Sequence, residues 1–251
     1  MTWLSEVWDE QVLTREVEEY LLRRGARTES YQELEIITWG VPYSPGPEDG
    51  LITHDPMRLV IEDATFQAKY GAPKGLDLTG WLACPVVSPK GKVIGFEARN
   101  TEKKALSEFL LPEAAWNPVW LGLCPSVMQR IWDGGDVWVV EGLFDLFPMQ
   151  WLVPEDDVVL ATLRARLTDK HVEFLRRFCQ GWVHMVYDQD EQGRKATFGW
   201  TDQEGRRRWG ALDKLKRVGL KCRDVPYSGG KDPGEIWDLG GARALRSYFK
   251  L

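Results

Sequence analysis

The sequence has few residues of the kinds that build zinc sites and no long apolar run. Only four of its 251 residues are cysteine and three are histidine. The cysteines are Cys84, Cys124, Cys179 and Cys222. They form no Cys-x-x-Cys pair, which argues against a zinc ribbon or finger and predicts four reduced thiols. No stretch of 18 apolar residues suggests a transmembrane helix, and the N-terminus does not read as a secretory signal. We therefore expect a cytoplasmic protein with no zinc and no membrane partner.

Positive charge is scarce in the first two thirds of the chain. Residues 1–160 hold 13 basic and 26 acidic residues, whereas residues 161–251 hold 19 basic and 12 acidic ones. The net charge of −6 argues against a protein that coats nucleic acid. The asymmetry indicates that the two parts of the chain have different partners.

Residues 1–130 have the pattern of a mixed α+β subdomain. Apolar residues at 3–4 spacing predict a helix over 5–24, which ends before Gly25, and Thr28 is expected to cap a short helix over 29–35. Glycine and proline mark residues 40–56 as a loop. Two β-rich runs, 81–87 and 93–99, flank a turn at 88–92 and predict a hairpin.

Strands and helices alternate from residue 131 to 251. The predicted strands cover residues 137–140, 158–161, 182–187 and 221–225. The predicted helices cover residues 143–152, 168–179, 193–218 and 235–250, the third interrupted near Gly199 and Gly205. This alternation is typical of an α/β fold with a parallel sheet flanked by helices. In such a fold, ligands bind at the carboxyl ends of the strands.

Acidic residues follow three of the predicted strands. Glu141 ends the first strand, Asp188 and Asp190 end the third, and Asp232 follows the fourth. Any one of them alone would be interpreted as a solvated charge or a helix N-cap. Together they form an oxygen-rich set that suits Mg²⁺ or Mn²⁺. The chemistry that such a site favours is phosphoryl or nucleotidyl transfer with one or two metal ions.

These motifs resemble the toprim domain, which topoisomerases and primases share. The resemblance is carried by Glu141-Gly-x-x-Asp145 and by Asp188-x-Asp190-x-x-Gly193, each after a strand. The rest of the chain resembles the catalytic core of bacterial DnaG-type primases, in a compact phage-like or mobile-element-like version. The segments that carry this second resemblance are residues 20–26, 85–99, 109–113, 120–123, 160–163 and 231–233.

The resemblance implies a DNA primase, a nucleotidyltransferase that makes RNA primers from NTPs on a single-stranded DNA template during replication. By this analogy Glu141, Asp188 and Asp190 are catalytic and hold two Mg²⁺ or Mn²⁺ ions, while Asp145 and Asp232 support the metal site. The residues implied in nucleotide or template binding are Arg99, Lys103, Lys231 and Arg194. The scarcity of cysteine leaves no zinc module for template recognition, so a replicative helicase or a separate recognition protein is an expected partner.

Three positions depart from the family pattern. Glu108 stands where a lysine is usual, Arg164 replaces a glycine, and Gly234 replaces an acid, for which Glu235 could substitute. Two alternatives therefore stay open. One is a toprim metal-dependent nuclease, and the other is a non-catalytic module that binds nucleic acid or a partner.

Overall fold

The structure is a computed structural model that describes most of the chain. The described residues are 8, 11–39, 65–69, 78–103, 106–110, 112–163 and 166–249. The predicted loop over 40–56 and Arg164 lie outside them. No helix among the described residues is long and apolar enough to cross a membrane.

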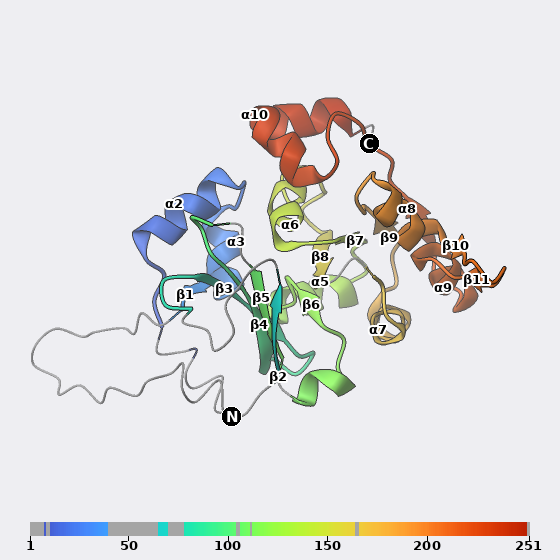
Figure 1. Ribbon diagram of the computed structural model, residues 1–251, viewed down its shortest axis with the longest axis horizontal. Helices are drawn as coiled ribbons and strands as arrows, with labels where there is room; N and C mark the ends of the chain where they lie inside the picture. Colours follow the sequence, from blue (N-terminus) through green and yellow to red (C-terminus); the bar gives the residue numbers. More distant parts are fainter. Residues whose placement is uncertain are drawn as a thin grey trace, which may run out of the picture. The chain divides into compact units, whose positions relative to one another are not determined.

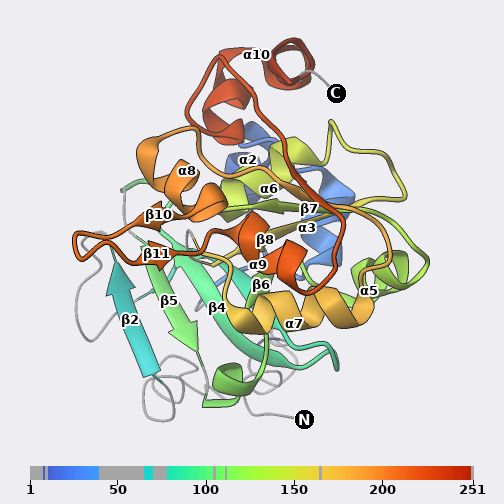
Figure 2. The same ribbon diagram turned by 90° about the vertical axis from the view of Figure 1, so that its right-hand side faces the viewer.

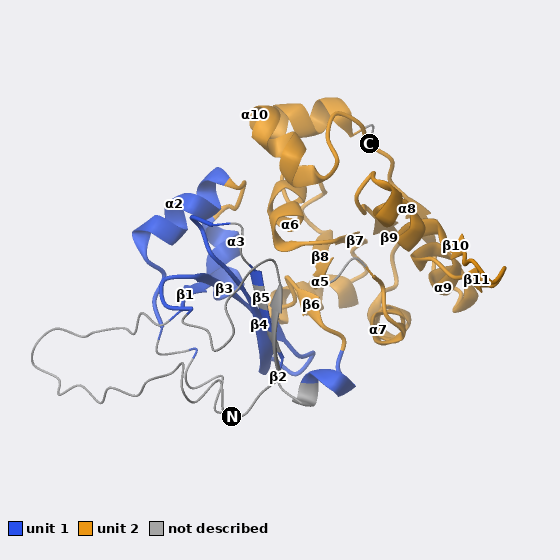
Figure 3. Cartoon of the chain, viewed as in Figure 1, with its two compact units in different colours: residues 1–23, 28–117 blue, residues 24–27, 118–251 orange. Residues whose placement is uncertain are grey.

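The chain divides into two compact units (Figure 3). The first comprises Met1–Arg23 and Thr28–Asn117, and the second comprises Arg24–Arg27 and Pro118–Leu251. The division after Asn117 comes earlier than the boundary after residue 130 that the sequence suggested. The reason is that β6 (Trp120–Leu121) pairs with β8 (Val158–Thr162) of the second unit's sheet.

Unit 1 is built on a five-stranded antiparallel sheet in the order β1-β3-β4-β5-β2 (Figure 1). Its strands are β1 (Ile37–Thr38), β2 (Thr65–Lys69), β3 (Leu82–Val87), β4 (Val93–Arg99) and β5 (Leu106–Leu110). The predicted hairpin is confirmed as β3–β4, and a 3-10 helix, η1 (Pro112–Trp116), follows β5.

The helices of unit 1 precede its sheet. In the described region the helix predicted over 5–24 is α2 (Arg15–Arg23), followed by α3 (Thr28–Glu33). Gly25 ends α2 with a φ of 88°, a left-handed conformation that glycine adopts without strain. The core of the unit includes Trp39 stacked on Phe96, with ring centroids 4.5 Å apart.

Unit 2 is built on a five-stranded sheet in the order β12-β9-β7-β8-β6, in which only β6 is antiparallel. The other strands are β7 (Val137–Val140), β8, β9 (Val183–Met185) and β12 (Cys222–Asp224). The predicted parallel sheet is therefore confirmed. Every residue of β7 is buried, as expected of a central strand with neighbours on both sides.

Helices flank the sheet of unit 2 (Figure 2). They are α5 (Pro125–Trp132), α6 (Leu143–Met149), α7 (Asp169–Phe178), α8 (Glu191–Phe198), α9 (Ala211–Arg217) and α10 (Pro233–Tyr248). Thr168 caps α7, as predicted, by accepting the N–H of His171 at 3.3 Å. Pro148 lies in the last turn of α6, and α10 bends at Gly240–Gly241.

The single interrupted helix predicted over 193–218 is wrong. Residues 200–201 and 207–208 form a hairpin, β10–β11, between α8 and α9. The predicted breaks are at the right places, because Gly199 and Gly205 both have φ of 78°, which a right-handed helix does not use. The chain between them turns back on itself, and the three arginines at 206–208 lie in the hairpin rather than on a helix.

His184 is a buried core residue, and both of its ring nitrogens have partners. Its Nε2 lies 2.9 Å from Asp136 Oδ2, and its Nδ1 accepts from Arg223 Nε at 2.8 Å. Its ring also stacks on Trp138 at 4.1 Å. These contacts account for the histidine without a catalytic role.

Candidate functional site

The acidic residues meet where β7 and β9 end. These neighbouring strands run parallel, so the residues that follow them emerge at the same edge of the sheet. Glu141 comes directly after β7, and its Oε1 accepts the backbone N–H of Asp188 at 3.2 Å. Asp190 then caps α8 and accepts the N–H of Gly193 at 2.9 Å. The structure thus brings together the three acids that were predicted to be catalytic.

Lys231 brings a positive charge to the aspartates. Its Nζ lies 2.9 Å from Asp188 Oδ2 and 3.4 Å from Asp190 Oδ2. Its backbone carbonyl accepts the N–H of Gln189 at 2.8 Å and the hydroxyl of Tyr227 at 2.9 Å. These bonds hold the loop after β12 against the loop after β9, so the placement of Lys231 is built into the fold.

Gly193, the last residue of the Asp-x-Asp-x-x-Gly motif, allows these loops to pack closely. A Cβ atom at this position would lie 2.1 Å from the carbonyl oxygen of Asp188. Only glycine therefore fits here without a backbone shift. The motif thus combines two carboxylates, Asp188 and Asp190, with the glycine that allows α8 to begin immediately after them.

Asp145 and Asp232 hold backbone groups of the helices beside the site. Asp145 Oδ2 accepts the N–H of Gly142 at 3.2 Å, and its Oδ1 accepts that of Gly234 at 3.3 Å. Asp232 caps α10 by accepting the N–H of Glu235 at 2.7 Å. Asp145 thereby joins the start of α6 to the start of α10, which packs against α6.

Burial, together with repulsion between neighbouring carboxylates, raises the pKa values of three acids at this site. Burial, followed by the charge of Asp188, raises the pKa of Glu141 to about 7. Burial also raises the pKa of Asp188 despite its contact with Lys231, and raises that of Asp145 well above the usual range. Asp190 differs, because the hydrogen bond from Gly193 lowers its pKa. A bound cation would stabilise the ionised forms of the buried acids.

Among the residues that the structure describes, no group of three or more His, Cys, Asp or Glu side chains is arranged to hold a metal ion. The cation between Asp188 and Asp190 is the Lys231 ammonium. The donors nevertheless fit Mg²⁺ or Mn²⁺, because all are carboxylate oxygens and two of them already converge on one positive charge. The Lys231 side chain is 48% exposed and has solvent into which it can withdraw.

The other predicted basic residues belong to other elements than Lys231. Arg194 extends along α8, with its guanidinium over the ring of Phe198 at 5.3 Å. Arg99 is the last residue of β4, in unit 1. Lys103 is exposed in the turn after β4, where its N–H donates to Asn100 Oδ1 at 2.7 Å.

Two of the departures from the family pattern, Glu108 and Gly234, lie among the described residues. Glu108 is buried in β5, opposite Glu97 of β4. A Cβ at Gly234 would lie 2.9 Å from the carbonyl oxygen of Phe144 and 3.1 Å from Arg24 Nη2, so a second acid would crowd this position. Glu235, its expected substitute, accepts the backbone N–H of Lys231 at 2.8 Å.

The sequence analysis missed Tyr227, whose hydroxyl also lies 3.2 Å from the carbonyl oxygen of Tyr187. Tyr227 thereby ties together the loops that carry Asp188 and Lys231. An aromatic residue shortly before Gly229-Gly230 was the available signal, but it does not by itself indicate such a contact.

Comparison with known proteins agrees with this geometry. Residues 138–237 match the Toprim-like family. The chain is 24% identical over 237 residues to a DNA primase of Deinococcus radiodurans, a match that covers 91% of this chain and 38% of the relative. The chain therefore spans about two fifths of the length of this relative.

Solved primase structures share the fold. The zinc-binding and RNA polymerase domains of Aquifex aeolicus primase align with a TM-score of 0.64 and 23% identity, covering 99% of this chain and 60% of the other. A DnaG primase catalytic domain bound to ssDNA aligns with a TM-score of 0.59 and 18% identity, covering 97% and 79%. Residues 138–237 are thus similar to the Toprim-like family, and the chain shares the fold of these solved primase structures.

Proposed function

We propose that the protein is a DNA primase that synthesises RNA primers on single-stranded DNA. The observation that carries the proposal is the convergence of Glu141, Asp188 and Asp190 at the carboxyl edge of the toprim sheet. The match to a DNA primase and the shared fold support it. Nucleotidyl transfer needs a site that binds cations next to phosphate, and this edge of the sheet offers clustered carboxylates with a lysine beside them.

Glu141, Asp188 and Asp190 would hold the Mg²⁺ or Mn²⁺ ions. When bound, such ions neutralise the charge of a triphosphate and activate the attacking hydroxyl. Asp145 and Asp232 act as positioning residues, because their hydrogen bonds fix the starts of α6 and α10 around the site. The number of ions, two, follows from the resemblance of the chain to primases.

Lys231 has a distinct role in this proposal. In the structure its ammonium balances part of the charge of Asp188 and Asp190. Substrate phosphate brings negative charge to the same place, and Lys231 can then pair with a phosphate oxygen instead of a carboxylate. Because the ammonium lies on a half-exposed side chain, this exchange needs no movement of the backbone.

The remaining basic residues and partners follow from the same proposal. Arg99, Lys103 and Arg194 would contact nucleotide or template, and their exposed or half-buried side chains allow it. By the resemblance to primases, we propose a replicative helicase or a template-recognition protein as a partner. The compartment we propose is the cytoplasm.

The test is primer synthesis by the purified protein. Single-stranded DNA, labelled NTPs and Mg²⁺ or Mn²⁺ should give short labelled RNA products, and Glu141→Gln should abolish them. Glu191→Gln is a matched control, because Glu191 lies beside the site but its side chain is 83% exposed and pairs with Lys195. Glu191→Gln should retain synthesis.

Two outcomes would refute the proposal. The first is a lack of RNA product with either metal and with the helicase present. The second is cleavage of labelled DNA or RNA with metal and no NTPs, because the same carboxylates would then position water, as in the nuclease alternative.

A further inference from the structure

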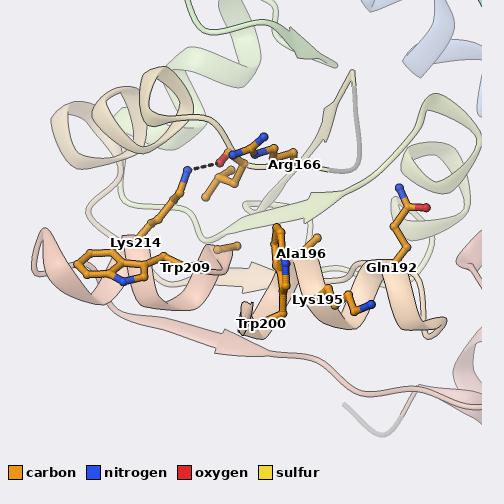
Figure 4. Close-up of a pocket in the computed structure, with 9 residues that line it drawn as sticks. Arg166, Gln192, Lys195, Ala196, Trp200, Trp209 and Lys214 are labelled. Atoms are coloured by element: carbon orange, nitrogen blue, oxygen red, sulfur yellow. Dashed lines mark hydrogen bonds between the residues drawn. The ribbon is translucent and has the colours of Figure 1, made fainter. Parts of the chain in front are cut away.

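An open pocket of about 230 Å³ lies in unit 2 (Figure 4). It is formed by the loop before α7, by α8, by the β10–β11 hairpin with the residue after it, and by the start of α9. Its lining residues are Arg166, Leu167, Gln192, Lys195, Ala196, Trp200, Trp209, Ala211 and Lys214.

Two tryptophans give this pocket aromatic surface. The Trp200 side chain lies beside Ala196 and Lys195, and Trp209 lies beside Lys214 (Figure 4). They are 36% and 44% exposed, whereas Trp120 and Trp138 of the same unit are buried in the core. Arg217 lies over the Trp209 ring at 4.5 Å, which helps to hold the indole in place. Exposed, positioned indoles are suited to stacking with another flat ring.

The charged side chains of the lining are all basic. Lys214 donates to the carbonyl oxygen of Leu167 at 3.0 Å (Figure 4). It also pairs with Asp169 at 2.9 Å. Lys195 pairs with Glu191 at 2.5 Å. The carboxylates of Asp169 and Glu191 are 95% and 83% exposed, so these ion pairs are weak and an incoming phosphate can replace them. Arg166 adds a third, exposed cation.

The surrounding segment is also basic. Residues 191–217 contain eight basic and four acidic residues, which gives this segment a net charge of +4 in a chain of net charge −6. Asp202 of the hairpin pairs with Arg206 and Arg208, at 3.2 and 2.8 Å, and those arginines remain about half exposed. The positive charge of the last third of the chain is thus partly gathered around the pocket.

We propose that this pocket binds an unpaired nucleotide of single-stranded nucleic acid, with the base against Trp200 or Trp209 and the phosphate near Lys195 and Arg166. Stacking requires an exposed aromatic face, and the phosphate requires a nearby cation; the pocket offers both. The proposal rests on the proposed function, which supplies single-stranded DNA as substrate. It adds a contact that is separate from the metal-binding carboxylates.

Helix α8 links the pocket to the acidic site. Asp190 caps the first turn of this helix, and Lys195 lies roughly 8 Å further along its axis at 1.5 Å per residue. A strand held in the pocket therefore remains close to the site of synthesis. The pocket would retain a template or product strand while the acidic site works on a neighbouring nucleotide.

The test measures binding of a fluorescein-labelled 12-nucleotide single strand by anisotropy, without NTPs or metal. Trp209→Ala should weaken binding by about 5- to 100-fold, the range that loss of one base–aromatic stack produces. Trp209→Phe retains a ring and should keep most of the affinity. Trp132→Ala removes a 58% exposed tryptophan of α5, outside the pocket, and should leave affinity unchanged.

A second kind of variant tests the phosphate contact at an exposed position, where a substitution is not expected to disturb folding. Lys195→Ala changes an exposed position on α8, and it should lower the slope of log affinity against log salt by about 0.7, the contribution of one phosphate contact to a single strand. Unchanged affinity in Trp200→Ala, Trp209→Ala and Lys195→Ala, with thermal unfolding like that of the wild type, would overturn the proposal. Equal affinity for a blunt duplex would also overturn it, because paired bases cannot stack on the indoles.

Two further arms separate this proposal from the others. Glu141→Gln should lose primer synthesis but bind the strand normally, so the pocket and the proposed function can fail independently. Competition with AMP distinguishes the source of the nucleotide. Displacement of the strand only at millimolar AMP supports a strand site, whereas displacement at micromolar AMP would overturn it in favour of a free-nucleotide site.

Discussion

Replacing Glu141 with glutamine should make the metal-free protein more stable at alkaline pH. Glu141 lies among like charges and is largely buried, and these surroundings raise its pKa from 4.5 to about 7. The folded state therefore holds the proton more tightly than the unfolded state does. As the pH rises from about 4.5 to 7, the unfolded chain releases this proton first, and the free energy of unfolding falls.

The size of the effect follows from the two pKa values. A difference of about 2.5 units corresponds to roughly 3 kcal/mol of lost stability at pH 8, at about 1.4 kcal/mol per unit. Glutamine has nearly the same shape and can still accept the N–H of Asp188, but it does not ionise. Glu141→Gln should thus recover up to about 3 kcal/mol at pH 8. At pH 5 the same argument leaves a gain of less than about 1 kcal/mol.

Thermal unfolding in EDTA at pH 5 and pH 8 measures this gain, which corresponds to roughly 6–12 °C in Tm for a chain of this size. Asp190→Asn is the matched control. Hydrogen bonding lowers the pKa of Asp190, so the folded state favours the ionised form of this residue. Removing the charge of Asp190 should therefore not stabilise the protein. Equal stability of Glu141→Gln and the wild type at pH 8 would refute the reasoning, as would a gain of the same size at pH 5.

Two further predictions concern the packing and charge around the same site. Gly193→Ala places a Cβ 2.1 Å from the Asp188 carbonyl oxygen and should lower the free energy of unfolding in urea by about 1–3 kcal/mol or more. An unchanged midpoint of urea unfolding would contradict this, because it would mean that the backbone shifts at no cost. Lys231→Gln removes the ammonium 2.9 Å from Asp188, so the pKa of Asp188 should rise further. Carboxyl NMR titration would detect this, and an unchanged or lower pKa would contradict the role of Lys231.

The acidic edge could be predicted because it depends on local pattern and simple topology. The apolar run of β7 identifies a buried strand, and a strand–helix alternation implies that neighbouring strands are parallel. From this, Glu141 and Asp188 had to emerge at one edge. The pairing of Lys231 with both aspartates could not be predicted from the pattern. The position of Lys231 depends on tertiary contacts, such as the hydrogen bond from the Tyr227 hydroxyl to the Lys231 carbonyl oxygen.

The hairpin between α8 and α9 was not predictable in the same way. Glycine at 199 and 205 correctly marked breaks, but the residues between them carry no strand alternation. The two strands have two residues each, and Trp200 pairs with Arg208. Because both strands are exposed, their sequence has no alternation of apolar and polar residues that would identify them. For the same reason the pocket beside Trp200 and Trp209 emerges only when the chain is folded.

The charge asymmetry of the sequence acquires a physical meaning from the fold. The acidic edge and the basic segment of residues 191–217 belong to one unit, linked through α8. A bound cation would offset the negative charge of the acidic edge, and bound phosphate would offset the positive charge of residues 191–217. The acidic surplus of residues 1–160 favours a basic partner for that part of the chain.

The most direct measurement is calorimetric titration of the protein with Mn²⁺ at pH 7 in buffers of different ionisation enthalpy. The account predicts saturable binding that is lost in Asp188→Asn. It also predicts release of roughly half a proton per protein molecule from Glu141, because this residue, with a pKa of about 7, is half protonated at this pH and must ionise to bind the ion. No binding heat in the wild type, or binding that Asp188→Asn leaves intact, would contradict the assignment of this acidic edge as the metal site.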